Sequence, residues 1–282
     1  EFAELRGKGY DAEAGERHLA WAESEFDGTG NTASTAPVET QPIFIVGMPR
    51  SGTTLIESIL GELDGVTTGG ESEALELVTS RYYRAGAKGQ WPRVQELQPQ
   101  HWDELAAAYW QAQLTPQARV TDKMPTNFRH IGMICRMFSS APVIHMRRDP
   151  RDVAWSIYSR YFPPGHRYAT DLEDIAHYYS LSLQLMEHFK SLHPERILEI
   201  QYEELIDRPE EMTQQLAEFC GLEWRKECLA FHERPRASYT FSELQVREPL
   251  NRKGIGRWRN YADALTPFVD ACVADGVQLQ EN

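Results

Sequence analysis

The sequence has few cysteines, and none of them is arranged for a disulfide-based redox site or a metal site. Four cysteines in 282 residues form no C-x-x-C pair and no zinc-ligand spacing. An unpaired cysteine usually packs as a small apolar residue. We therefore expect four reduced, mostly buried thiols in a cytoplasmic protein: Cys135, Cys220, Cys228 and Cys272.

The sequence also lacks long apolar runs and has an excess of acidic over basic residues. No run approaches the roughly 18 apolar residues that a membrane helix requires, and residues 1–18 contain no signal-peptide core. The net charge is −13, from 29 basic and 42 acidic residues. Such a surface repels nucleic acid and anionic membranes, which argues against both as partners. Hydrophobic residues at 41% and charged residues at 25% are typical of a globular protein.

Composition divides the chain into three predicted parts. Residues 1–26 show helical spacing of apolar positions and predict a helical remnant of something longer, outside the main core. Residues 27–42, DGTGNTASTAPVETQP, are rich in Gly, Thr, Ser and Pro and predict a linker. Residues 43–282 are expected to form the main domain.

Strands alternate with long helices in this main domain. Apolar and β-branched runs predict strands, and amphipathic runs predict helices. The alternation predicts an α/β fold of three layers, with a central parallel sheet flanked by helices. Folds of this kind bind ligands at the carboxyl ends of their strands. The predicted strands are 43–47, 119–123, 142–148 and 196–202, and the predicted helices are 52–61, 72–85, 101–113, 126–138, 151–161, 172–192 and 210–220.

The first chemical motif is IFIVGMPRSGTT, residues 43–54, which joins a predicted strand to a predicted helix. Its two glycines fit the ends of G-x-x-x-x-G-K-[ST], and its converging N–H groups and helix N-terminus predict an anion site. Thr53 occupies the position of the lysine, and the cation is instead Arg50. This layout favours one phosphate and an adjoining small anion over a magnesium-bound triphosphate. Taken alone, the motif leaves an ATP-dependent small-molecule kinase open.

The second motif is HMRRDPRDVAWSIYSR, residues 145–160. Arg148 ends a predicted strand, and Asp149 with the following proline can open the next helix. Ser156 and Arg160 are four residues apart and so share one helix face. A guanidinium with a hydroxyl nearby can clamp a phosphate. A surface network of arginines and aspartates is the alternative for this segment alone.

Together the two motifs resemble sulfotransferases that use 3′-phosphoadenosine 5′-phosphosulfate (PAPS). PIFIVGMPRSGTTL resembles their 5′-phosphosulfate loop, and RRDPRDVAWSIYSR resembles their 3′-phosphate element. The resemblance covers about residues 42–270 and is greatest to bacterial tetratricopeptide-repeat sulfotransferases and to tyrosylprotein sulfotransferases. Residues 1–26 resemble the end of a repeat region. Further similar segments are GGESEAL, VTDKMPTNF, IQYEELIDRPEE, FCGLEW and QVREPLNRKGIGRWRNY.

The resemblance implies a P-loop-like fold and transfer of a sulfuryl group to a hydroxyl acceptor. The acceptor would be a protein tyrosine or a small phenol or alcohol, and the product nucleotide adenosine 3′,5′-bisphosphate. Because sulfate carries less charge than a terminal phosphate, no metal should be required. We expect the two arginine motifs to face one cleft. The implied nucleotide-binding residues are Arg50, Ser51, Gly52, Thr53, Thr54, Arg148, Ser156, Arg160, Tyr202, Lys253 and Arg257, with the choice between the last two left open.

The implied catalytic residues are Arg50, Lys123 and Glu71. Lys123 would contact the transferring group, and Asp122 would orient it or cap the following helix. Glu71 would be the general base; its rivals are Glu73 and, more remotely, His130. Glu71 lies at the head of a predicted helix, which would lower its pKa, so burial would have to offset the helix dipole. A capping carboxylate is the alternative role.

Two further hypotheses concern the acceptor and the class of protein. The Pro-Pro-Gly run in residues 161–174 predicts a flexible loop on the acceptor side. A non-catalytic binding module, with an N-terminal helical repeat as its working part, is the alternative to an enzyme.

Overall fold

The strand β1 (Ile43–Gly47) forms the centre of a parallel sheet. In the computed structural model, the described residues are 9–28, 33–34, 41–86, 93–113, 119–162, 165–233 and 248–279. Within them, five strands lie in the order β2-β3-β1-β4-β5, and every pairing is parallel. The other strands are β2 (Thr67–Thr68), β3 (Val120–Asp122), β4 (Val143–Arg147) and β5 (Ile197–Gln201).

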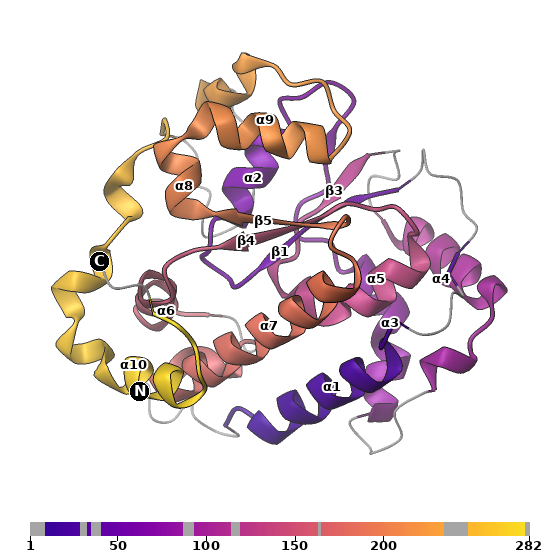
Figure 1. Ribbon diagram of the computed structural model, residues 1–282, viewed down its shortest axis with the longest axis horizontal. Helices are drawn as coiled ribbons and strands as arrows, with labels where there is room; N and C mark the ends of the chain where they lie inside the picture. The colour runs from indigo at the N-terminus through magenta and orange to yellow at the C-terminus, as the bar shows by residue number, and fades with distance from the viewer. Residues whose placement is uncertain are drawn as a thin grey trace.

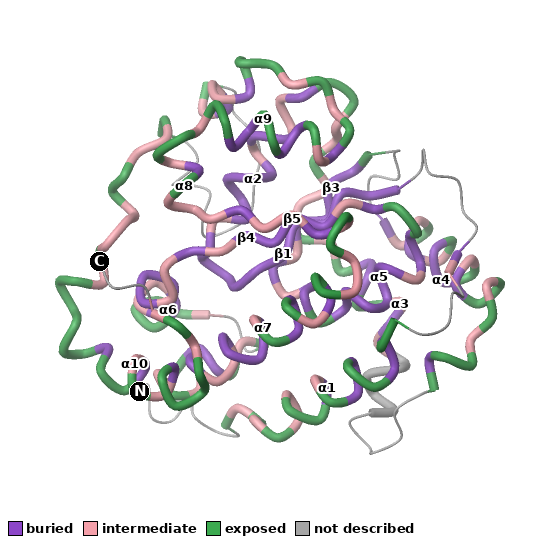
Figure 2. Tube along the Cα trace, viewed as in Figure 1, coloured by how far each residue is buried: buried purple, intermediate pink, exposed green. Residues whose placement is uncertain are grey.

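Alternate side chains of β1 enter two separate apolar cores, one on each face of the sheet. Phe44 and Val46 belong to one cluster, and Ile43 and Ile45 to the other. Figure 1 shows α2 (Thr53–Leu60), α8 (Tyr202–Asp207) and α9 (Pro209–Phe219) on one face, with α5 (Ile131–Met137) and α7 (Leu172–Leu192) on the other. In Figure 2 the strands are largely buried between these layers. The predicted α/β fold is confirmed.

Most helices lie within a few residues of their predicted bounds. α7 has the predicted bounds and begins at Asp171, whose carboxylate accepts hydrogen bonds from two main-chain N–H groups. α3 (Ala74–Gly86) begins two residues later than predicted. The predicted helix 126–138 is a 3₁₀ segment, Pro125–His130, followed by α5. The remaining helices are α4 (Pro99–Ala112), α6 (Pro150–Tyr158) and α10 (Thr266–Ala274). The helices α8 and α10 and the short strand β2 were not predicted, and Tyr202, expected at the end of a strand, begins α8.

For residues 9–26, the described part of the first segment, the expectation that it lies outside the main core is wrong. α1 (Ala12–Glu25) packs along α7, as Figure 1 shows, and Trp21, Ala22 and Phe26 are buried in the cluster that contains Phe44 of β1. Apolar contact with α7 therefore makes α1 part of this core. Most of the expected linker lies outside the described residues. The three-part division of the chain itself stays a prediction.

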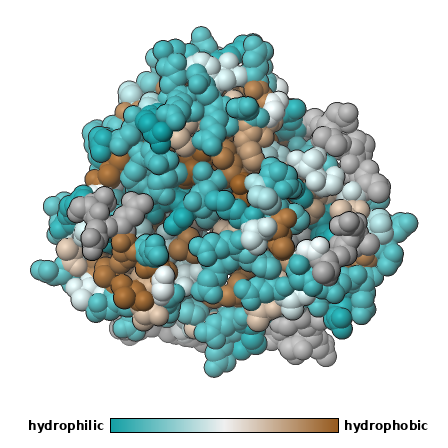
Figure 3. Space-filling model, viewed as in Figure 1, coloured by the Kyte–Doolittle hydropathy of each residue, from teal (hydrophilic) through white to brown (hydrophobic). Residues whose placement is uncertain are grey.

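The four cysteines are free and buried, as predicted. Across the described segments, no helix is both long enough and apolar enough to span a bilayer. Figure 3 shows hydrophilic residues over most of one face, with apolar residues gathered in the region of α10, whose Val273 is 63% exposed.

Candidate active site

The loop after β1 curls tightly at the carboxyl edge of the sheet. Gly47 and Gly52 have φ of 149° and 112°, which an L side chain rarely adopts. A Cβ on Gly47 would lie 2.4 Å from the carbonyl oxygen of Met146, and one on Gly52 would lie 2.9 Å from the ring of Tyr202. Arg50 has φ of 72° although it is not a glycine. Such strain is characteristic of functional loops.

Four arginines concentrate positive charge beside this loop. Arg50 donates from Nε to Ser156 Oγ at 3.0 Å, and Arg148 donates from Nη1 to the Arg50 carbonyl at 3.0 Å. Burial lowers the pKa of Arg50 to about 10, and the charges of Arg160, Arg148 and Arg257 act in the same direction. An anion would relieve this repulsion, so the cluster is suited to binding phosphate.

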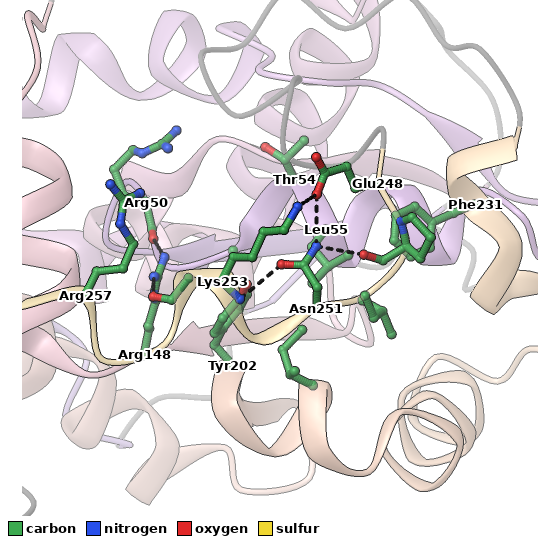
Figure 4. Close-up of a pocket in the computed structure, with 15 residues that line it drawn as sticks. Arg50, Thr54, Leu55, Arg148, Tyr202, Phe231, Glu248, Asn251, Lys253 and Arg257 are labelled. Atoms are coloured by element: carbon green, nitrogen blue, oxygen red, sulfur yellow. Dashed lines mark hydrogen bonds and ion pairs between the residues drawn. The ribbon is translucent and has the colours of Figure 1, made fainter. Parts of the chain in front are cut away.

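A cavity of about 260 Å³ opens beside the arginines. Figure 4 shows Arg50, Arg148 and Arg257 together at one end, with Leu55 and Phe231 toward the other. The predicted residues that line it are Arg50, Gly52, Thr54, Arg148, Tyr202, Lys253 and Arg257. The two arginine motifs thus face one cavity. Its cationic and apolar ends suit a ligand with phosphates at one end and a flat apolar ring at the other.

The other predicted nucleotide-binding residues lie beside this lining. Ser51 and Thr53 are buried within the loop. Ser156 reaches Arg50, and Arg160 acts on it through its charge. α6 ends at Tyr158, so Ser156 and Arg160 do not share a helix face as predicted. Ser156 accepts a hydrogen bond from Arg50, whereas the like charge of Arg160 repels Arg50.

Tyr202 and Trp258 each lie under an arginine. The Arg148 guanidinium is 4.6 Å from the centre of the Tyr202 ring, and the Arg151 guanidinium is 3.7 Å from that of Trp258. Tyr202 also packs over Gly52 of the loop. The contact with Tyr202 orients the Arg148 side chain, and the contact between Arg151 and Trp258 holds the 256–258 segment against α6.

Asp152 holds the segment that carries Arg257, and the sequence did not reveal this role. Its buried carboxylate accepts hydrogen bonds from the N–H groups of Gly256 at 2.7 Å and Trp258 at 2.9 Å. Lys253, by contrast, donates to Glu248 at 2.7 Å and is largely exposed. Figure 4 shows Arg257 beside Arg50 and Arg148, and Lys253 directed at Glu248.

Lys123 and Glu71 form an ion pair at the end of β3. Lys123 Nζ lies 2.7 Å from Glu71 Oε1; the lysine side chain is 0% exposed and that of the glutamate 42% exposed. Glu71 precedes α3, which begins at Ala74, so it is not in the first helical turn. The half-exposed carboxylate can therefore meet a second molecule while it contacts a buried cation.

A second carboxylate, Glu57 of α2, ties the Glu71 segment to the sheet. It accepts hydrogen bonds from the N–H of Gly70 at 2.9 Å and from Thr121 Oγ1 at 2.7 Å. The Lys123 N–H donates in turn to the Gly70 carbonyl at 2.9 Å. Because α2 begins where the loop after β1 ends, Glu57 links that loop to the Lys123–Glu71 pair. No sequence motif marked this residue.

Asp122 does not contact the ammonium of Lys123 through a direct hydrogen bond in the described contacts. Its carboxylate accepts from Tyr109 at 2.9 Å and Asn127 at 3.0 Å, and from the main chain at Met124. Of the two predicted roles, the structure favours holding the start of the following 3₁₀ segment. Burial raises the pKa of Asp122 to about 7.

His130, the rival candidate for the general base, is buried and contacts a carboxylate other than Glu71. It contacts Glu76 at 3.0 Å, and burial lowers its pKa.

In the expected acceptor-side loop, residues 163–164 lie outside the described residues. His166, in the described part of that loop, is close enough to Glu71 for the carboxylate to raise its pKa, although burial lowers it more. Among the described residues, no group of three or more His, Cys, Asp or Glu side chains could hold a metal ion.

Comparison with known proteins gives consistent matches. The sequence model of the sulfotransferase family matches residues 42–226. The chain is 35% identical to an uncharacterised protein of Aquifex aeolicus, over 82% of this chain and 32% of that protein. It is 28% identical to a putative protein-tyrosine sulfotransferase of Caenorhabditis briggsae, over 77% of this chain and 80% of that protein.

A solved structure shares the fold. The sulfotransferase domain of the Synechococcus PCC 7002 olefin synthase superposes with a TM-score of 0.57 at 21% identity, covering 89% of this chain and all of that domain. The chain spans 32% of the Aquifex protein and 46% of a Drosophila melanogaster protein-tyrosine sulfotransferase, so it corresponds to only part of those proteins.

Proposed function

The chain belongs to the sulfotransferase family, as the resemblance of its two motifs implied, and we propose that it transfers a sulfuryl group from PAPS to a hydroxyl acceptor. Family membership confirms the prediction of an enzyme. The observation that carries the choice of donor is the single cavity lined by both Arg50 and Arg148. Two separate cationic motifs on one cavity suit a nucleotide that bears phosphate groups at two positions.

The residues present fit this donor. Arg148 Nε is buried and has no hydrogen-bond partner within the described residues, and Arg50 is held among like charges. Arg50, Thr54 and the loop N–H groups would hold the 5′-phosphosulfate; Arg148, Ser156, Arg160 and Arg257 would hold the 3′-phosphate. Tyr202 would lie on the adenine side. The bound donor supplies an activated sulfuryl group on a phosphate leaving group.

The Lys123–Glu71 pair supplies the acid–base chemistry in this proposal. Glu71 is half exposed and would take the proton from the acceptor hydroxyl. Lys123 and Arg50 would stabilise the charge that develops on the leaving phosphate. No metal is required in this scheme, because the cations come from side chains; activity should therefore persist in EDTA.

Tyrosine is one proposed acceptor, since several relatives are named protein-tyrosine sulfotransferases. A small phenol or alcohol is the other. A cytoplasmic location is part of the proposal and is supported by the four free, buried thiols. The kinase hypothesis, based on the loop alone, is not favoured by the family match.

Calorimetric titration with adenosine 3′,5′-bisphosphate tests the donor. We expect a Kd in the nanomolar-to-micromolar range, on the order of −8 to −12 kcal/mol. Arg148→Ala should weaken binding by roughly 10- to 100-fold, the value of a charged hydrogen bond. The matched control is Arg208→Ala, which removes an exposed arginine paired with Glu204 and Glu211. Tight binding of Mg·ATP without binding of the bisphosphate would contradict the proposal.

Transfer from radiolabelled PAPS tests the acceptor. Incorporation of label into a tyrosine peptide, but not into its phenylalanine counterpart, would identify tyrosine. Label in a small phenol or alcohol alone would identify the second class.

A further inference from the structure

A chain of buried hydrogen bonds runs through the protein behind the Lys123–Glu71 pair. Ser72 Oγ donates to Gln113 Oε1 at 2.7 Å, and Gln113 Nε2 donates to Tyr109 Oη at 2.8 Å. Tyr109 Oη donates to Asp122 Oδ2 at 2.9 Å, and Asn127 Nδ2 donates to Asp122 Oδ1 at 3.0 Å. Apart from Ser72, which is half-buried, every member is buried. We refer to these five residues as the Tyr109 chain.

Two members of the Tyr109 chain adjoin the two members of the ion pair. Ser72 directly follows Glu71, and Asp122 directly precedes Lys123. The bridge between them is formed by Tyr109 of α4 and by Gln113, which directly follows that helix and whose N–H donates to the Tyr109 carbonyl at 3.0 Å. A helix that contributes no residue to the cavity thus fixes the spacing of the two segments that carry the pair.

The surroundings of the Tyr109 chain are apolar, so its polar groups require an explanation. The Tyr109 ring packs against Phe44 and Phe138, with ring centres 6.0 Å and 5.1 Å apart. Polar groups buried in such a core are costly unless each one is hydrogen-bonded. A fully connected network rigidifies its members and specifies one arrangement. Glu57, which binds Gly70 and Thr121, holds the same two segments from the other side.

We propose that Tyr109, Gln113 and Asp122 are positioning residues that hold Glu71 and Lys123 in contact through the segments next to them. The consequence for catalysis rests on the proposed sulfuryl transfer. The consequence for the ion pair does not, because Lys123 is buried and paired whatever reaction takes place. Breaking the chain at its centre should loosen the pair while leaving the nucleotide cavity intact.

Tyr109→Phe tests this, because it removes one hydroxyl from the centre of the chain and keeps the packed ring. We expect kcat to fall by about 10- to 100-fold, the range for a misplaced catalytic group. The KM for PAPS and the affinity for adenosine 3′,5′-bisphosphate should stay within about twofold, because the chain contributes no cavity residue. Acetylation of Lys123 by acetic anhydride, followed by mass spectrometry, should become roughly tenfold faster as the pair opens.

Tyr10→Phe is the matched control for loss of a tyrosine hydroxyl. Tyr10 bonds His177 at 3.0 Å where α1 meets α7 and belongs to no part of the site. It should change neither kcat nor the labelling of Lys123. Two further variants test the half-buried end of the chain, at Ser72. Ser72→Ala should reproduce the effects of Tyr109→Phe. Ser72→Thr keeps the hydroxyl and should behave like the wild type.

Unchanged kcat and unchanged labelling in Tyr109→Phe would overturn the proposal. So would equal losses in Tyr109→Phe and Tyr10→Phe, which would mean that only general stability had changed. If the wild type bound no adenosine 3′,5′-bisphosphate but Lys123 labelling still rose in Tyr109→Phe, the positioning role would stand and the proposed function would fall.

Discussion

Lys123 is a lysine with no exposed surface, and its ammonium lies 2.7 Å from a carboxylate that is 42% exposed. A buried cation needs an acceptor, since an unpaired charge in the interior is costly. Glu71 supplies that acceptor while remaining open to a second molecule. The same residue therefore has a structural role toward Lys123 and a proposed chemical role toward the acceptor hydroxyl.

Substitution of Glu71 by glutamine and by alanine should separate these roles. Both variants should lose about 100-fold or more in kcat, because neither side chain can act as a base. Glutamine still offers an oxygen to Lys123, whereas alanine should lower the free energy of unfolding by about 1–3 kcal/mol more. Steady-state transfer assays and urea denaturation would measure the two effects. The control is Glu73→Gln; a large loss there, with none in Glu71→Gln, would make Glu73 the base.

Asp122 should make stability depend on pH. Burial raises its pKa from 3.8 to about 7, although Tyr109, Met124 and Lys123 act in the opposite direction. Folding therefore favours the protonated acid. Its stabilising contribution is fully present below pH 3.8 and is lost as pH rises through about 7.

The comparison that isolates this effect is wild type against Asp122→Asn. The difference in free energy of unfolding between them should change by a few kcal/mol (about 1.4 per pH unit) between pH 4 and 7, in the direction of lost wild-type stability. Histidines titrate equally in both proteins, so they cancel in the difference. Urea denaturation at a series of pH values measures it, and parallel curves would refute the expectation.

The sequence indicated residues whose types form a recognisable motif, and it missed residues whose roles depend on distant contacts. Arg50 and Arg148 stand in runs whose residue types imply anion binding without any knowledge of the fold. Asp152 and Glu57 are ordinary helix carboxylates in sequence. Their roles come from contacts with Trp258 and Thr121, far away along the chain, which only tertiary packing creates.

At the scale of elements, the long helices and buried strands were predictable, and short or irregular elements were not. α7 carries its apolar pattern over its full length and begins at a capping aspartate, Asp171. β2 has two residues, too few for any periodicity to be visible. Arg160 was expected within the predicted helix 151–161, but α6 ends at Tyr158.

The segment that carries Arg257 depends on α6, because Asp152 near the start of that helix binds its N–H groups. Asp152→Ala should release the segment and weaken binding of adenosine 3′,5′-bisphosphate by about tenfold, the effect of losing one well-placed cation. Calorimetry measures this. The matched control is Asp171→Ala, which also removes a carboxylate that binds two main-chain N–H groups, at Glu173 and Asp174.

The control should lose about 1 kcal/mol of stability, as expected for a helix cap, with no change in affinity. Unchanged affinity in Asp152→Ala would mean that Arg257 does not depend on this contact or does not meet the nucleotide.

At the scale of the whole molecule, α1 belongs to the same apolar core as the sheet. The Gly- and Ser-rich stretch after α1 suggested that this helix lies outside the main core. Such a composition indicates a flexible connection, but it does not show which element the helix packs against. The apolar stripe that ends at Trp21 and Ala22 was visible in the sequence. Its partner, α7, lies about 150 residues further along, and periodicity alone identifies no partner.

Phe26→Ala tests whether α1 and the sheet unfold together. The Phe26 ring packs against Phe189 of α7 and against Gly132, where an added Cβ would lie 2.6 Å from it. Its loss should cost about 3–5 kcal/mol. If α1 and the sheet form a single cooperative unit, this loss of stability shifts one urea transition to lower urea concentration. Adenosine 3′,5′-bisphosphate should then stabilise that same transition. Leu77→Ala, at an exposed position, should cost almost nothing. If α1 were a separate unit, the ligand-stabilised transition would stay in place while an earlier one moved, because the lost contacts would then contribute nothing to the stability of the sheet and its other helices.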